Sequence, residues 1–143
     1  MKKILILNGP NLNMLGIREP DLYGTQTYEN LVDYCRECAL DLSLDVDFEQ
    51  TNHEGKMVDI IQASYGVYDG IVLNAGAYTH YSIAILDALK AVSIKTVEVH
   101  LTDVDSRDEF RKISVIREAC DTVFSGYGFE SYKKALEYLS ENL

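Results

Sequence analysis

The chain has 143 residues, of which 47% are hydrophobic and 25% are charged, and its formal net charge is −10 at pH 7. A chain of this length buries about two thirds of its unfolded surface in one core, so its stability requires neither disulfides nor a metal. The negative net charge and the scattering of the 13 lysines and arginines argue against a nucleic-acid-binding surface. An anionic ligand would be repelled at long range and could be held only by a local group of arginines.

Three cysteines, an odd number, and the lack of a recognisable leader predict a soluble protein of a reducing, cytoplasmic compartment. The N-terminal apolar stretch runs only from Ile4 to Leu7, whereas a signal peptide has about 7 to 15 apolar residues. No stretch approaches the roughly 20 apolar residues that span a bilayer. We therefore expect no membrane partner.

Apolar runs typical of strands alternate along the chain with segments of helical periodicity, without repeats or a linker. The predicted strands are Ile4–Leu7, Val46–Glu49, Gly70–Asn74, Thr96–His100 and Thr122–Ser125. The first helical stripe is Leu31, Cys35, Cys38 and Leu42, with Thr27 in front of it as the expected N-cap. The other stripes are Met57, Ile60, Ile61 and Tyr65; Ile83, Leu86, Leu89 and Val92; and Tyr132, Ala135, Leu136 and Leu139.

This alternation predicts an α/β fold with a parallel sheet covered on both faces. Five strands at this length favour a flavodoxin-like three-layer sandwich of strand order 2-1-3-4-5, with residues 1–143 as a single domain. Ligands of such folds bind outside the carboxyl ends of the strands. The segments "NGPN", "QTNHEG", "NAGAYTH" and "HLTD" follow the first four strands and contain all three histidines, His53, His80 and His100.

Several familiar site types fit these segments poorly. Cys35 and Cys38 have redox-pair spacing, but they lie within a helical stripe, which favours buried structural thiols. The histidines lack the close spacing of zinc ligands, so we expect no metal. The loop "NGPNLNMLG" lacks the dinucleotide and P-loop glycine patterns and the hydroxyls of a flavin phosphate site. A flavin-binding or regulatory module of the same fold nevertheless stays open as the alternative to an enzyme.

The segment 8–24 is much longer than the median loop of about 4 to 6 residues, which suggests a lid or a site. A single arginine is usually a solvated surface charge. Here, however, Arg18 and Tyr23 share one segment, and His100 is followed by Arg107 and Arg111. A phenol acting as a base at neutral pH needs its pKa lowered by about 3 units, or roughly 4 kcal/mol, which two guanidinium groups in a desolvated pocket can supply.

Five stretches together resemble a known family in order and spacing: "NGPNLNMLGIREPDLYG", "QTNHEG", "NAGAYTHYSIAILDAL", "EVHLTDVDSRDEFR" and "GYGFESYKKAL". The chain resembles the type II 3-dehydroquinate dehydratases from Ile4 to Leu139. The resemblance implies no cofactor, a homododecamer built as a tetramer of trimers, and loss of water from 3-dehydroquinate to give 3-dehydroshikimate. This lyase step belongs to the shikimate pathway of aromatic amino acid biosynthesis or to quinate breakdown.

The resemblance implies an anti elimination through an enolate and assigns residues to its first half. Tyr23 matches the base that removes the proton next to the ketone, and Arg18 and Arg107 match the guanidinium groups that keep it ionised. Asn11 matches the amide that holds a water against the enolate oxygen. The segment Leu15–Gly24 matches a closing lid.

The second half of the reaction and the binding of substrate follow from the same resemblance. His100 matches the general acid that protonates the departing hydroxyl, and Glu98 orients it and helps it hold its proton. Asp87 matches a residue that reaches the site of the neighbouring subunit. Substrate binding falls to Asn74, His80 and Arg111 on ring hydroxyls and to the backbone amides of Leu101 and Thr102 on the carboxylate.

The chain departs from the family pattern near the predicted carboxylate site. Thr102 and Asp103 stand where many members have Ser-Asn, which places an additional carboxylate beside that turn. The lysines lie at the N-terminus, in helical stripes or, as Lys95, at the start of a strand. A desolvated site lysine for a Schiff-base route is therefore not expected, and a proton-transfer mechanism fits better.

Overall fold

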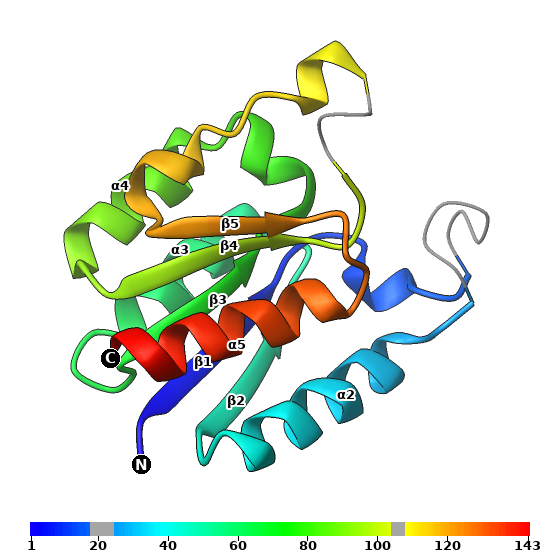
Figure 1. Ribbon diagram of the computed structural model, residues 1–143. Helices are drawn as coiled ribbons and strands as arrows, with labels where there is room; N and C mark the ends of the chain where they lie inside the picture. Colours follow the sequence, from blue (N-terminus) through cyan, green and yellow to red (C-terminus); the bar gives the residue numbers. More distant parts are fainter. Residues whose placement is uncertain (18–24, 104–107) are drawn as a thin grey trace.

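A parallel sheet of five strands forms the centre of the computed structural model, which describes residues 1–17, 25–103 and 108–143 (Figure 1). The strands lie in the order β2-β1-β3-β4-β5, which confirms the predicted flavodoxin-like topology. Each strand pairs in parallel with its neighbour. Their bounds are β1 (Lys3–Asn8), β2 (Asp45–Gln50), β3 (Gly70–Asn74), β4 (Lys95–His100) and β5 (Thr122–Ser125).

Helices cover both faces of this sheet, as Figure 1 shows. One face carries α2 (Tyr28–Asp41) and α5 (Glu130–Asn142), and the other carries α3 (Glu54–Ala63) and α4 (Ile83–Val92). Short 3-10 helices follow the strands: η1 (Leu12–Met14), η2 (Gly76–His80), η4 (Glu109–Arg111) and η5 (Ile116–Ala119). Within the described ranges, no helix is long and apolar enough to cross a bilayer.

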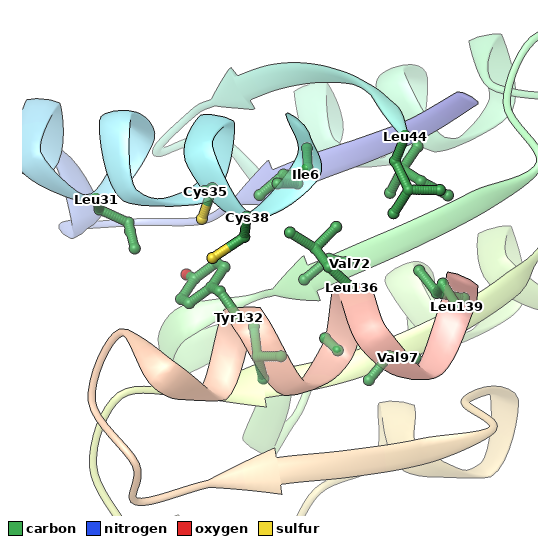
Figure 2. Close-up of a cluster of buried hydrophobic side chains, with 14 of the residues drawn as sticks. Ile6, Leu31, Cys35, Cys38, Leu44, Val72, Val97, Tyr132, Leu136 and Leu139 are labelled. Carbon is green, nitrogen blue, oxygen red and sulfur yellow. The ribbon is translucent and has the colours of Figure 1, made fainter. Parts of the chain in front are cut away.

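Side chains on the strands alternate between two cores, one on each face of the sheet. Ile4, Ile6, Val72 and Val97 pack beneath α2 and α5, and Leu5, Leu7, Ile71 and Leu73 pack beneath α3 and α4. In Figure 2, Tyr132, Leu136 and Leu139 of α5 lie beside Val72 and Val97 of the sheet. Because both faces are covered, the central strands appear in the sequence as continuous apolar runs.

The first predicted helix begins where the sequence indicates. Thr27 accepts a hydrogen bond from the backbone of Asn30, and the Asn30 side chain accepts one from the backbone of Thr27, which forms a capping box. Cys35 and Cys38 are buried on the inner side of α2. Burial raises the pKa of the Cys35 thiol far above its usual value, the reverse of a reactive redox cysteine.

Two predicted helical stripes are partly wrong. Tyr65 lies beyond the end of α3 and is 71% exposed, because the chain turns at Ser64 and Gly66, where φ is +76°. Ile83 is 62% exposed on α4. The first turn of α4 contains only apolar residues, so residue spacing could not show which of them are buried. The buried face of α4 is formed by Ile85, Ala88, Leu89 and Val92.

Leu136→Ala is expected to lower the free energy of unfolding by about 2 to 5 kcal/mol, because it empties a fully buried position on α5. Urea unfolding followed by circular dichroism measures the change. Leu40→Ala is the matched control, since Leu40 is 79% exposed on α2 and its truncation should change stability by less than about 0.5 kcal/mol. Equal losses in the two variants would contradict the assigned core.

Candidate active site

The carboxyl ends of β1, β3 and β4 bring three predicted site residues to one edge of the sheet. Asn8, the last residue of β1, pairs with Asn74 of β3, and His100 ends β4. Asn11 lies in the loop that follows β1. The strand order reverses between β1 and β3, and ligands of this fold class bind at that point.

Two glycines let the loops after β1 and β3 touch. The amide of Gly9 donates to the carbonyl of Asn74 at 2.7 Å, and a Cβ on Gly9 would lie 2.7 Å from the carbonyl oxygen of Ala75. Gly76 has a φ of +58°, and a Cβ there would lie 3.0 Å from the carbonyl oxygen of Pro10. Larger residues at either position would push the two loops apart.

A buried hydrogen-bond network fixes the side chain of Asn74, which is only 4% exposed. Its Nδ2 donates to the hydroxyl of Tyr132 at 3.0 Å, and its Oδ1 accepts from the amide of Gly76 at 3.2 Å. The Tyr132 hydroxyl donates onward to Oδ1 of Asn8 at 2.6 Å. Burial raises the pKa of Tyr132 well above its usual value, so this phenol is a neutral donor.

The sequence predicted Tyr132 only as a core residue and missed its part in this network. Its ring packs in the core beneath α2 and α5, while its hydroxyl reaches the ends of β1 and β3. The presence of a tyrosine in a core position could have predicted such a network, because a buried phenol needs a hydrogen-bond partner.

The motif "QTNHEG" after β2 braces the loop that carries Asn11. The backbone amide of Asn11 donates to Oδ1 of Asn52 at 3.0 Å, and Nε2 of Gln50 donates to the carbonyl of Gly9 at 3.1 Å. Tyr78 donates from its hydroxyl to the carbonyl of Asn52 at 2.8 Å. Asn11 has a φ of +71°, a left-handed conformation that asparagine tolerates.

His100 and Glu98 form a buried pair on β4. Nε2 of His100 lies 2.5 Å from Oε2 of Glu98, and the two residues are 6% and 0% exposed. Burial by itself would raise the pKa of Glu98, but hydrogen bonds from His100 and Arg117 outweigh it and hold that pKa below its usual value. Glu98 is therefore a carboxylate that can only accept, so Nε2 of His100 carries a proton.

The turn after β4 is held by β5 and the residues beyond it. The carbonyl of Leu101 accepts from the amide of Gly128 at 2.9 Å, and the carbonyl of Thr102 accepts from the hydroxyl of Ser125 at 3.0 Å. Both carbonyls of the predicted carboxylate-binding turn are thereby fixed.

His80 and Arg111 belong to two segments that are tied together. Nδ1 of His80 lies 2.7 Å from the carbonyl oxygen of Ile113, and this places η2 against the segment that contains Arg111. The Nε of Arg111 lies 3.6 Å from the carboxylate of Asp108 and is buried without a hydrogen bond among the described residues. Asp87 is exposed on α4.

Three predicted catalytic residues, Arg18, Tyr23 and Arg107, lie outside the described residues. The beginning of the predicted lid is described: Leu15 is 5% exposed and packs into the core beneath α2. Gly16 has a φ of +86°, and a Cβ there would lie 2.9 Å from the carbonyl oxygen of Thr25. Gly16 and Thr25 therefore lie close together, and a larger residue at position 16 would not fit.

Comparison with known proteins decides the family. The family model described as dehydroquinase class II matches residues 2–140. The chain belongs to this family. The resemblance of its motifs to the type II enzymes is thus confirmed over nearly the whole chain.

Relatives of this class II dehydroquinase match nearly its whole length. A protein of Caldicellulosiruptor saccharolyticus named 3-dehydroquinate dehydratase is 52% identical, with 100% of this chain and 99% of that protein covered. The crystal structure of a type II dehydroquinase from Butyrivibrio crossotus has a TM-score of 0.94 and 49% identity, covering 96% and 97% of the two chains. A 3-dehydroquinate dehydratase-like protein of Bifidobacterium longum has a TM-score of 0.71 and 29% identity, with 99% and 98% covered.

Proposed function

We propose that this class II dehydroquinase is a 3-dehydroquinate dehydratase, a lyase that converts 3-dehydroquinate to 3-dehydroshikimate. Membership of the family and the names of its relatives support the activity. The structural observation that carries the proposal is the buried pair of His100 and Glu98, which lies at the strand edge where Asn11 and Asn74 also lie. Residues 1–143 act in this proposal as one catalytic domain.

His100 is the general acid of the proposed reaction. Elimination leaves a hydroxide equivalent that must be protonated as the carbon–oxygen bond breaks. Glu98 accepts the proton that Nε2 of His100 carries and fixes the orientation of the ring through this 2.5 Å contact. Because the pair is buried, this interaction is only weakly screened by solvent.

Tyr23, as a phenolate, is the proposed base, and Arg18 and Arg107 stabilise its negative charge. This assignment is supported by the matched motifs rather than by geometry, because these residues lie outside the described ranges. Asn11 holds a water against the enolate oxygen, and its loop is braced by the hydrogen bond to Asn52. Closure of the segment Leu15–Gly24 would bring Tyr23 to the substrate and exclude water.

The substrate contacts are proposed at groups that the protein already orients. Asn74, His80 and Arg111 bind ring hydroxyls, and the amides of Leu101 and Thr102 bind the carboxylate. The buried Nε of Arg111, without a hydrogen bond among the described residues, supports this role because such a donor needs an explanation. The carboxylate of Asp103, next in the chain, is expected to weaken substrate affinity.

The proposal includes a homododecamer, in which Asp87 reaches the site of a neighbouring chain. The exposed position of Asp87 on α4 is compatible with such a contact. The reaction as proposed needs no cofactor, since it consists of proton transfers alone. The cytoplasmic location expected from the cysteines is part of the same proposal.

Purified protein mixed with 3-dehydroquinate is expected to produce a rise in ultraviolet absorbance, because the product contains a conjugated double bond. The preparation should be colourless, since no flavin is involved. Absence of turnover over a range of pH and protein concentration would refute the dehydratase. A yellow preparation would favour the flavin-binding alternative.

Tyr23→Phe is expected to abolish turnover, a loss in kcat of at least about 10²-fold, because only the proton acceptor is removed. Steady-state kinetics and circular dichroism would be measured together to separate loss of activity from loss of folding. Tyr65→Phe is the matched control and should keep full activity, since Tyr65 is 71% exposed beyond α3. Substantial turnover by Tyr23→Phe would refute the assignment of the base.

His100→Asn should lower kcat by about 10²-fold or more through loss of the general acid. His53→Asn serves as the control because His53 is exposed in front of α3 and its side chain makes no capping hydrogen bond. If the His100 variant retains turnover near that of the parent chain, another group protonates the leaving hydroxyl.

A further inference from the structure

The carboxylate of Glu98 is held from two sides. His100 contacts its Oε2, and Arg117 engages both oxygens, with Nε donating to Oε1 at 3.3 Å and Nη2 donating to Oε2 at 3.1 Å. The hydroxyl of Ser114 donates to Oε1 at 3.0 Å. The carboxylate therefore lies between an imidazole and a guanidinium fork.

Arg117 comes from η5, outside the motifs that assign catalytic roles in this chain. The stretch "EVHLTDVDSRDEFR" ends at Arg111, and sequence spacing gave no reason to connect Arg117 with β4. The packing of η5 against α4 carries the guanidinium to the carboxylate. The planar fork of arginine suits two carboxylate oxygens, which the single ammonium of a lysine cannot match.

We propose that Arg117 is a positioning residue for the general acid: it holds the Glu98 carboxylate in place, so that Glu98 in turn orients His100 toward the leaving hydroxyl. This inference rests on the proposed dehydratase activity and deepens it. Arg117 acts through Glu98 and need not touch the substrate.

The groups that face Glu98 explain why a cation from outside β4 is needed. A carboxylate that is 0% exposed would take up a proton unless its charge is compensated. Cys120 faces it from the segment before β5, but burial and the charge of Glu98 raise the pKa of that thiol to about 12, so it stays neutral. The Ser114 hydroxyl is also neutral. Arg117 therefore supplies the charge compensation that faces Glu98 from outside β4.

Loss of Arg117 has a defined consequence for the pH dependence. Burial acts to raise the pKa of Glu98, while the hydrogen bonds and charges of His100 and Arg117 lower it. Without Arg117 the pKa of Glu98 must rise, so the carboxylate is protonated at a higher pH. A protonated Glu98 no longer presents two accepting oxygens to His100 and Arg117, so it no longer orients the His100 ring, and the acidic limb of the kcat profile moves to higher pH.

The test compares Arg117→Gln and Arg117→Lys with the parent chain, using kcat and KM for 3-dehydroquinate across pH. Arg117→Gln should lower kcat by about 10-fold or more with KM within about 2-fold, and should move the acidic limb to higher pH. Arg117→Lys keeps the charge and should recover part of both losses. Arg36→Met is the control. Arg36 is on α2, where its guanidinium lies over the ring of Phe48, and its removal should leave the pH profile of kcat unchanged.

The outcomes separate this inference from the proposed function. If the parent chain turns over 3-dehydroquinate and Arg117→Gln keeps the kcat and the acidic limb of the parent, the role of Arg117 is refuted while the dehydratase stands. A parent chain without turnover refutes both. If Arg117→Gln does not fold, Arg117→Lys decides: a lower kcat with unchanged KM supports the role, and parental kinetics refute it.

Discussion

Parallel strands that are covered on both faces leave little room for polar side chains except where the strands end. In this chain the middle of β1 and β3 is apolar and fully buried, and asparagines stand at their last positions, Asn8 and Asn74. All five strands run in one direction, so their carboxyl ends meet at one edge. The candidate site is a consequence of this constraint, because that edge is where the polar groups can gather.

The polar groups at this edge are oriented by the protein itself. Tyr132 and Gly76 bind the two ends of the Asn74 amide, and Asn52 accepts from the backbone of Asn11. Groups that are held in place before the substrate arrives need little reorganisation during the reaction. The residues that hold Asn74 and Asn11 come from α5, η2 and the segment after β2. The site therefore depends on how these separate segments pack against the sheet.

Glu98 is a charged side chain in the buried interior of a strand. It lies within β4, on the face covered by α3 and α4, and is compensated by His100 and Arg117. A buried charge of this kind contributes little to stability by itself, because desolvation offsets much of the attraction. Its role in the proposed reaction is to orient His100, because a carboxylate without access to water holds a neighbouring imidazole in a fixed position.

The sequence alone determined the five strands, their order, the helix start at Thr27 and, through its motifs, the family. Those features depend on local periodicity, capping and residue spacing, all of which can be read along the chain. Only the tertiary structure decided which side of α4 is buried, where Ile83 proved exposed, and which residues support the site. Tyr132 and Arg117 reach partners 58 and 19 positions away in the sequence, at Asn74 and Glu98, and no local pattern encodes such contacts. They arise because the packing of α5 against the sheet and of η5 against α4 brings those side chains to Asn74 and Glu98.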